Sequence, residues 1–260
     1  MNHALTIARK EIIDGLRDIR SLFASLCYAL MGPIVVGFVS LATRDANPGS
    51  SAAVLTGMMA VFMLVSAFVG GMNVAMDTVA GERERRSLLP LLLNPVGRST
   101  VLLGKWLAVS FFALVGSTVT GLGFLIVFAT SGVHPTETGV RAFLPIALGL
   151  LSLPLLAAAV QLMISTVSRG VKEAQTYLSL IVFGPMGVGM FLVFRPAAKW
   201  DWCSFVPLVG QQLQLEALMN GQHVRWFQPI VLGYLTGALA VMFLLLAANR
   251  LQRDEIIYGN

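Results

Sequence analysis

Long runs of uncharged apolar residues recur along the whole chain, and they constrain its fold more than any other feature. Residues 21–43, for example, contain no charged side chain. About 20 apolar residues in a helix span a bilayer, and within lipid every backbone polar group must be bonded internally. Only 12% of the 260 residues are charged, whereas soluble domains carry about 25%. The sequence therefore predicts an all-α integral membrane protein, built as a single domain over residues 1–260.

The apolar runs predict six transmembrane helices. The predicted spans are residues 21–43, 54–76, 106–130, 143–167, 176–194 and 227–248. Asp77 is expected to end the second span, and the third span either begins at Trp106 or begins earlier with Lys105 reaching the membrane surface. Before the sixth span, residues 207–219 are apolar but too short to cross, and tryptophans typical of a membrane interface lie near them. This segment predicts two short outer-surface or re-entrant helices.

Residues 3–20 predict an amphipathic helix that lies along the inner membrane surface. Apolar residues recur there at steps of three and four, at Leu5, Ala8, Ile12, Leu16, Ile19 and Phe23. Lys10, Asp14 and Arg17 fall on the other face, and the spacing of Lys10 and Asp14 suits an ion pair. The alternative is a helix that only begins the first span.

The distribution of cations predicts the orientation, because short inner loops carry an excess of lysine and arginine. If the N-terminus is inside, most of the 18 cations lie inside. The exceptions are Arg44, Arg141, Arg195, Lys199 and Arg225. This bias predicts six spans with both termini in the cytoplasm, and it explains the net charge of +5 without a nucleic-acid partner.

The segment 80–105, between the second and third spans, combines a dense run of charge with a run of leucines. The charged run Glu82-Arg83-Glu84-Arg85-Arg86 is followed by leucines around Pro90 and by Asn94-Pro95. This composition suits a short helix at the membrane surface, with its charges directed toward solvent or a protein partner and its leucines toward lipid. The alternative is a positively charged inner loop that only anchors the topology.

The same segment resembles the cytosolic coupling segment of type-2 ABC transporter permeases, in particular the NatB-like sodium-efflux group. The matching residues are Gly81, Glu82, Arg83, Glu84, Arg85, Leu88, Pro90, Leu91, Leu92, Pro95, Val96, Arg98, Leu102, Leu103, Gly104 and Lys105. The sequence departs from the pattern at four positions. Arg86 replaces a usual glycine, Ser87 a threonine, Leu89 a glutamate and Gly97 a serine.

The resemblance implies the permease subunit of an ATP-driven exporter. Such a subunit pairs with a second permease chain, the same or related, and works with two copies of a cytosolic ATP-binding subunit in a bacterial or archaeal inner membrane. The residues that the resemblance assigns to coupling are Glu82, Arg83, Glu84, Arg85, Leu88, Pro90, Leu91, Pro95 and Arg98. The inner loop with Arg169, Lys172 and Glu173 is expected to be a second contact or, alternatively, a topology anchor.

The chain lacks the motifs of an enzyme. It has no phosphate-binding loop and no HExxH motif, so ATP and Mg²⁺ are expected in the partner subunit and no cofactor in this chain. The span interiors hold no charged residue, which weakens the alternative of a stand-alone carrier. A membrane scaffold that only recruits a cytosolic partner is the other alternative.

The cargo is open at this stage. Asn73, Gln161, Ser165 and Thr236 are polar groups within the predicted spans. Together with many methionines, they suit a drug-like or amphipathic molecule or a lipid at least as well as Na⁺.

Overall fold

The computed structural model of the chain describes residues 2–43, 48–87, 96–131, 140–194, 201–220, 222 and 224–251. Over these residues the chain is helical and contains no strand, as the sequence predicts. The elements are α1 (Asn2–Arg17), α2 (Ile19–Ala42), α3 (Pro48–Gly70), α4 (Met72–Ala75), the π-helical turn η1 (Met76–Gly81), α5 (Glu82–Glu84), α7 (Arg98–Ser131), α8 (Val140–Val167), α9 (Val171–Phe194), the 3₁₀-helix η3 (Asp201–Phe205), α10 (Val209–Met219) and α11 (Phe227–Leu251).

Five helical stretches in the described part of the chain are long and apolar enough to cross a membrane. They are Ile19–Ala42, Val54–Glu84, Arg98–Val127, Val171–Phe194 and Phe227–Leu251. The predicted fourth span corresponds to α8, in which Leu151–Val167 forms a shorter apolar stretch. The apolar helices agree with a membrane permease, while the count of six spans stays a prediction.

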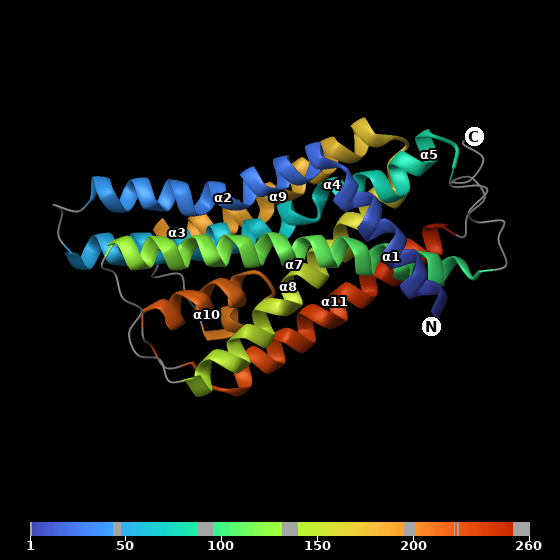
Figure 1. Cartoon of the computed structure of the whole chain (residues 1–260). Coiled ribbons are helices and arrows are strands. Elements are labelled where there is room, and N and C mark those ends of the chain that lie inside the picture. Colours follow the sequence, from blue (N-terminus) through green and yellow to red (C-terminus); the bar gives the residue numbers. More distant parts are fainter. Residues whose placement is uncertain are drawn as a thin grey trace.

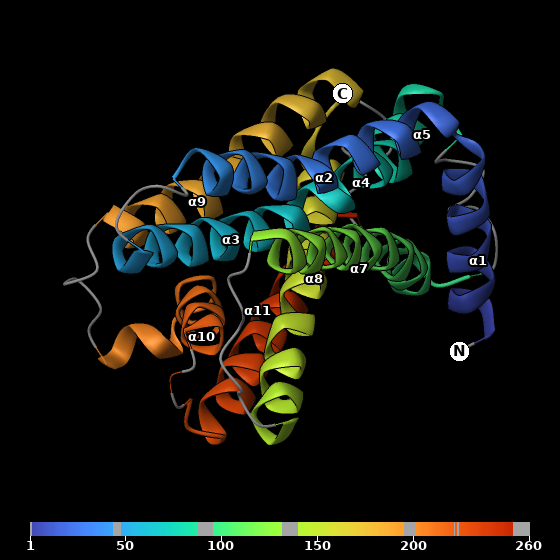
Figure 2. The same ribbon diagram turned by 60° about the vertical axis from the view of Figure 1, so that its left-hand side comes forward.

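The long helices form two groups that cross one another. In the first group, α2, α3, α7 and α9 run roughly along one another, and in the second group α8 and α11 lie side by side (Figure 1). The short helix α10 packs between the two groups, against α3, α8 and α11 (Figure 2). Helix α1 lies across the end of α7, at the same end of the molecule as α5 (Figures 1 and 2). We call this end the charged end, because α1, α5 and the α8–α9 junction bring their charged residues together there.

The two groups share a buried apolar core near the charged end. Its members come from η1, α7, α8 and α11, and they include Val79, Leu102, Leu162, Ala240 and Leu244. Each of these side chains is less than a tenth exposed. Burial of a leucine or valine side chain contributes about 1.5–3 kcal/mol in water. Within a bilayer, lipid tails are as apolar as leucine, so the stabilisation comes instead from close packing between helices. Close packing at this core therefore holds α8 and α11 against the other helices.

A pair of glycines sets the crossing of α3 and α7. A Cβ atom on Gly116 would lie 2.8 Å from the Cα atom of Gly70, and a Cβ atom on Gly70 would lie 3.0 Å from the carbonyl oxygen of Phe112. The two backbones therefore approach so closely that only glycine fits. Small residues at helix contacts are the usual device for close packing within a membrane.

The second span continues past the position predicted for its end. The expectation that Asp77 ends it is wrong, because the chain passes from α3 through α4 and η1 into α5 and stays helical to Glu84. The π-helical turn inserts one extra residue into the turn, and it rotates the residues that follow. The charged residues there have partners within the chain: Asp77 pairs with Arg85, and Glu82 is buried beside Lys105, as described below.

The two short helices predicted before the sixth span are present as η3 and α10. The polar residues of α10 lie inside the protein. Gln211 and Gln212 are fully buried, and their amides donate to Thr236 Oγ1 at 2.9 Å and to the Gly189 carbonyl at 3.1 Å. Helix α10 is thus inserted between α9 and α11 rather than resting on a surface.

Candidate functional site

The charged run that opens the predicted coupling segment lies at the end of a helix. Glu82 and Glu84 belong to α5, which continues the second span. For these two acids, the expectation of a separate short helix at the membrane surface is therefore wrong. Residues 88–95 lie outside the described residues, so the predicted surface helix and its residues Leu88, Pro90, Leu91 and Pro95 stay a prediction.

Glu82 faces inward, and a buried lysine neutralises it. Glu82 is 9% exposed, and its Oε1 atom lies 2.9 Å from Nζ of Lys105, which is only 1% exposed. The same ammonium lies 3.2 Å from Oε1 of Glu11 and donates to the Thr78 carbonyl at 2.6 Å. An ammonium has three protons to donate, and these three acceptors use all of them. The expectation that Lys105 reaches the membrane surface is wrong, because its partners lie inside the protein.

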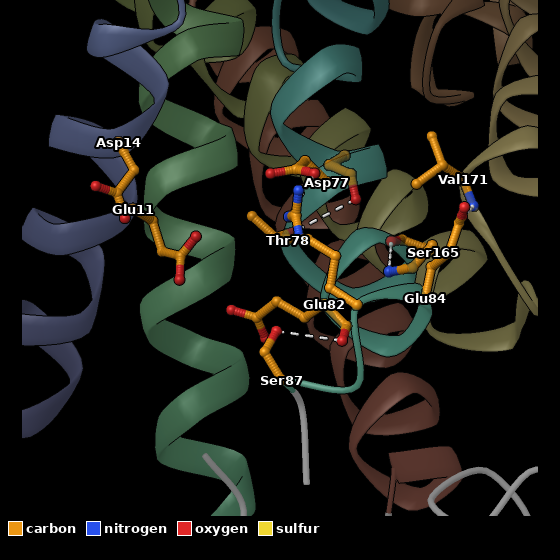
Figure 3. Close-up of polar contacts among 12 residues, drawn as sticks. Glu11, Asp14, Asp77, Thr78, Glu82, Glu84, Ser87, Ser165 and Val171 are labelled. Carbon is orange, nitrogen blue, oxygen red and sulfur yellow. Dashed lines mark hydrogen bonds and ion pairs between the residues drawn. The ribbon is translucent and has the colours of Figure 1, made fainter. Parts of the chain in front are cut away.

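The partner Glu11 is supplied by the surface helix. Figure 3 shows Glu11 extending from α1 past α7 toward Glu82. Helix α1 can lie this close because Gly104 has no side chain, and a Cβ atom there would lie 2.8 Å from the Ala4 carbonyl oxygen. We call the contact of Glu11, Glu82 and Lys105 the buried clamp. It joins α1, α5 and α7 at the charged end.

Lys10 adds a more exposed cation to this group. Its Nζ atom lies 3.3 Å from Oε1 of Glu11, 3.7 Å from Oδ2 of Asp14 and 3.9 Å from Oε1 of Glu82. Partial burial by itself would lower the pKa of the Lys10 ammonium, but the three carboxylates outweigh it and the pKa is raised. The predicted ion pair of Lys10 and Asp14 is present. Arg17 lies exposed in the last turn of α1, where a cation suits the helix dipole.

Arg83 and Glu84 bind the junction between α8 and α9. The Arg83 guanidinium donates to the carbonyl of Thr166 at 2.8 Å and to the carbonyl of Ser168, both at the C-terminal end of α8. Oε2 of Glu84 accepts from the backbone N–H of Val171 at 2.9 Å, at the first residue of α9 (Figure 3). A cation thus meets the negative end of one helix dipole and an anion the positive end of the next. The charged run between the second and third predicted spans is therefore in direct contact with the inner loop that follows the fourth.

Within the second loop, the three predicted residues differ in what they do. Oε2 of Glu173 accepts from the backbone N–H of Arg169 at 2.7 Å, which satisfies a donor at the start of α9. Arg169 and Lys172 are exposed. The carboxylate therefore stabilises the loop, and the two cations are the groups that face outward.

Two further arginines make contacts within the chain. Arg85 pairs with Asp77, with Nη2 and Oδ1 2.7 Å apart, and this hydrogen bond raises the pKa of Arg85. Nη1 of Arg98 donates to the carbonyl of Leu251 at 3.3 Å, which connects the start of α7 to the end of α11. Both contacts hold the charged end together.

The polar groups of the spans connect helices to one another. The Asn73 amide donates to Ser25 Oγ at 3.1 Å, and Ser165 Oγ accepts from the backbone N–H of Ala80 at 3.1 Å. Gln161 donates to the Phe68 carbonyl, and Thr236 accepts from α10 as described. No group of three or more His, Cys, Asp or Glu residues in the described ranges is arranged to hold a metal ion.

Sequence reasoning missed Glu11 and assigned Lys105 to the surface. The only available signal was a lysine at the edge of an apolar run and a carboxylate on a helix expected to lie near it. Those two residues are 94 positions apart, and nothing in the local pattern pairs them. Cys27 is exposed and Cys203 is buried, and both are free.

Comparison with known proteins identifies the group of proteins that this chain resembles. The sequence profile described as "ABC-2 family transporter protein" matches residues 5–231. The ABC transporter permease protein NatB of Bacillus subtilis is 36% identical over 225 residues, which cover 81% of this chain and 56% of NatB. The probable ABC transporter permease protein NosY of Pseudomonas aeruginosa is 35% identical over 126 residues, covering 46% of this chain and 42% of NosY. The matches thus span about half the length of these curated relatives or less.

Proposed function

Because the chain belongs to the ABC-2 transporter family and is a multi-pass ABC transporter permease, we propose that it is the membrane subunit of an ATP-driven exporter. It works as a dimer with a second permease chain, and two cytosolic ATP-binding subunits supply the energy. Its single domain crosses an inner membrane six times, with α8 as the fourth span and both termini in the cytoplasm. The charged end then faces the cytoplasm.

The observation that carries this proposal is the mechanical continuity of the charged end. The buried clamp joins α1 and α7 to α5 through Glu11, Glu82 and Lys105. Arg83 and Glu84 join α5 to the α8–α9 junction. A displacement of the segment between the second and third spans therefore reaches α1, α7, α8 and α9 together.

This connection suits a rocking mechanism. ATP binding closes the pair of ATP-binding subunits, and the permease follows as a rigid body because its cytosolic segments cannot slide independently. Rigid-body motion between two states is a common way to convert ligand binding into a distant change. The role of this chain is then to receive motion and to shape the pathway, and ATP hydrolysis belongs to the partner.

For the cargo, we propose an apolar or amphipathic molecule in preference to a bare cation. The amide nitrogens of Asn73 and Gln161 donate to groups of other helices, and the hydroxyl of Ser165 accepts from the backbone of Ala80, so these groups connect helices. A cation pathway needs several converging oxygens to replace the hydration shell of the ion, and of these groups Gln161 offers one buried oxygen without a partner. Many large apolar or aromatic side chains are exposed on the described spans, among them Phe38, Leu180 and Tyr234.

Reconstitution tests the proposal directly. The chain is co-expressed with candidate ATP-binding subunits, purified through a tag on the permease, and placed in liposomes. We expect a stable complex with an ATP-binding subunit and ATP hydrolysis that amphipathic compounds stimulate and orthovanadate inhibits. A permease that retains no ATP-binding subunit and moves a solute in response to an ion gradient alone would contradict the proposal and favour a secondary carrier.

A further inference from the structure

Arg86 has a backbone conformation that an arginine rarely adopts. Its φ angle is 57°, in the left-handed region. There it ends α5 with two hydrogen bonds, from the Arg86 N–H to the Arg83 carbonyl at 3.0 Å and from the Ser87 N–H to the Glu82 carbonyl at 2.9 Å. These bonds define a Schellman motif, in which the left-handed position is usually glycine. Because glycine is the usual residue at such a position, the local backbone geometry does not account for the arginine of this chain.

A strained conformation persists where the surroundings or a function require it. Glycine would adopt this conformation without a clash between its side chain and the backbone. The arginine must therefore be explained by its side chain, and that side chain is exposed.

The neighbouring charges are all engaged within the chain. Glu82 is buried in the clamp, Arg83 binds carbonyls of α8, Glu84 binds the start of α9, and Arg85 pairs with Asp77. Among the residues that the structure describes, Arg86 has no side-chain hydrogen bond or ion pair. It is thus the exposed member of the charged run that has no such contact.

Further exposed cations lie at the α8–α9 junction, which α5 contacts. The contact of Glu84 with Val171 places α5 beside the α8–α9 junction, where Arg169 and Lys172 are exposed. Their carboxylate neighbour Glu173 is turned to the backbone N–H of Arg169. A partner that presents negative charge would complement these exposed cations.

We propose that Arg86 is a docking residue that binds an acidic surface of the ATP-binding subunit. This proposal rests on the proposed function and specifies which charge of the coupling segment the partner recognises. The acids Glu82 and Glu84 have a different part, because they hold the segment in place within the permease. The chain keeps a strained arginine at a glycine position because the contact with the partner requires the cation.

Three substitutions at one position separate charge from backbone strain. Arg86→Lys keeps the charge and the strain, Arg86→Gln removes the charge and keeps the strain, and Arg86→Gly removes both. Arg225→Gln is the matched control, since it removes an exposed cation before α11, at the other end of the molecule from α5 (Figure 1). Each permease is purified in detergent, and its affinity for the purified ATP-binding subunit is measured together with its thermal unfolding temperature.

We expect the affinity for the ATP-binding subunit to depend on the positive charge at position 86. The unfolding temperature should depend on whether the residue there strains the backbone. The Kd should rise about tenfold for Arg86→Gln and Arg86→Gly, and stay within about threefold of wild type for Arg86→Lys and Arg225→Gln. The wild-type Kd should also rise more steeply with salt than that of Arg86→Gln, because a charge contact is screened. Arg86→Gly should unfold at a higher temperature than wild type, although it binds the partner more weakly.

Two outcomes would overturn this proposal without touching the proposed function. One is equal binding of the ATP-binding subunit by wild type, Arg86→Gln and Arg86→Gly. The other is unchanged binding accompanied by a loss of flotation with vesicles that contain phosphatidylglycerol, which would assign Arg86 to the membrane surface. If the wild-type permease bound no ATP-binding subunit at all, the proposed function itself would fail.

Discussion

Lys105 of α7 and Glu82 of α5 form a buried ion pair, with Nζ and Oε1 2.9 Å apart. Glu11 of α1 shares the same ammonium. Two carboxylates and one ammonium carry a net negative charge, and the half-exposed Lys10 nearby offsets it. Three chain segments that are distant in sequence are therefore fixed to one atom. The stability of the charged end and its ability to transmit motion depend on the same contact.

Replacing Lys105 by methionine should destabilise the folded permease strongly. The change leaves Glu11 and Glu82 without the cation that neutralises them, and removing one partner of a buried ion pair costs about 3–5 kcal/mol. The exposed control Lys10→Met should lower the free energy of unfolding by about 1 kcal/mol or less. Thermal unfolding of the two variants in detergent measures the difference. Equal stability of Lys105→Met and Lys10→Met would show that the clamp is not a stabilising contact.

A double variant separates the loss of the pair from the loss of the charge. In Glu82→Gln/Lys105→Met one acid and one base are removed together, so the charge balance is restored. We expect it to be more stable than Lys105→Met alone. A double variant that is less stable by the sum of the two single effects would argue against direct coupling.

Glu82 and Glu84 should respond differently to the same substitution. Glutamine at Glu82 loses the ion pair with Lys105 inside the protein, and we expect a loss of about 1–3 kcal/mol. Glutamine at Glu84 keeps an oxygen that can accept from the Val171 N–H at an exposed site, so we expect a loss of less than about 1 kcal/mol. Both are measured by unfolding of the permease without its partner, and equal losses would contradict the buried position of Glu82.

Much of the architecture follows from hydrophobic pattern, because a bilayer leaves few alternatives. The apolar stretches predicted α2, α3, α7, α9 and α11, and the periodicity of residues 3–20 predicted α1. The pattern failed at Asp77, since a charge normally marks the end of a span. The charge of Asp77 is accommodated in the continuing helix by an ion pair with Arg85, which lies eight residues further along the chain. That compensation depends on the turn geometry, which composition does not reveal.

The candidate site was less predictable than the fold. The sequence identified the charged run and the second inner loop as functional candidates, and the structure shows that they are in contact. The sequence alone did not show which charged side chains are buried and which are exposed. Lys105 is a charged residue, yet it is buried because carboxylates neutralise it inside the protein. One of them, Glu11, lies in another helix. Arg86 was noticed only as a departure from glycine, and its meaning required the backbone angle.

The glycine pair between α3 and α7 gives a prediction about packing. Gly116→Ala adds a methyl group 2.8 Å from the Cα atom of Gly70, so the two helices must separate. Overpacking of this kind costs about 1–3 kcal/mol. Gly187→Ala in α9 is the control, since no atom outside its own helix lies within 4 Å of a Cβ atom there. Thermal unfolding should separate the two alanine variants, and indistinguishable values would mean that the helices are not in close contact at Gly70.

The cation bias predicts which end of the molecule faces the cytoplasm, and single cysteines can test it. Cys27→Ser/Cys203→Ser provides a background without native thiols. Ser50→Cys lies near the start of α3 and Ser87→Cys follows α5, and these elements lie at opposite ends of the molecule (Figure 1). Because most arginines and lysines fall on the Ser87 side, we expect an impermeant maleimide to label Ser50→Cys in intact cells and to label Ser87→Cys only after permeabilisation. The reverse pattern would place the charged end outside, where no ATP-binding subunit could reach Arg86.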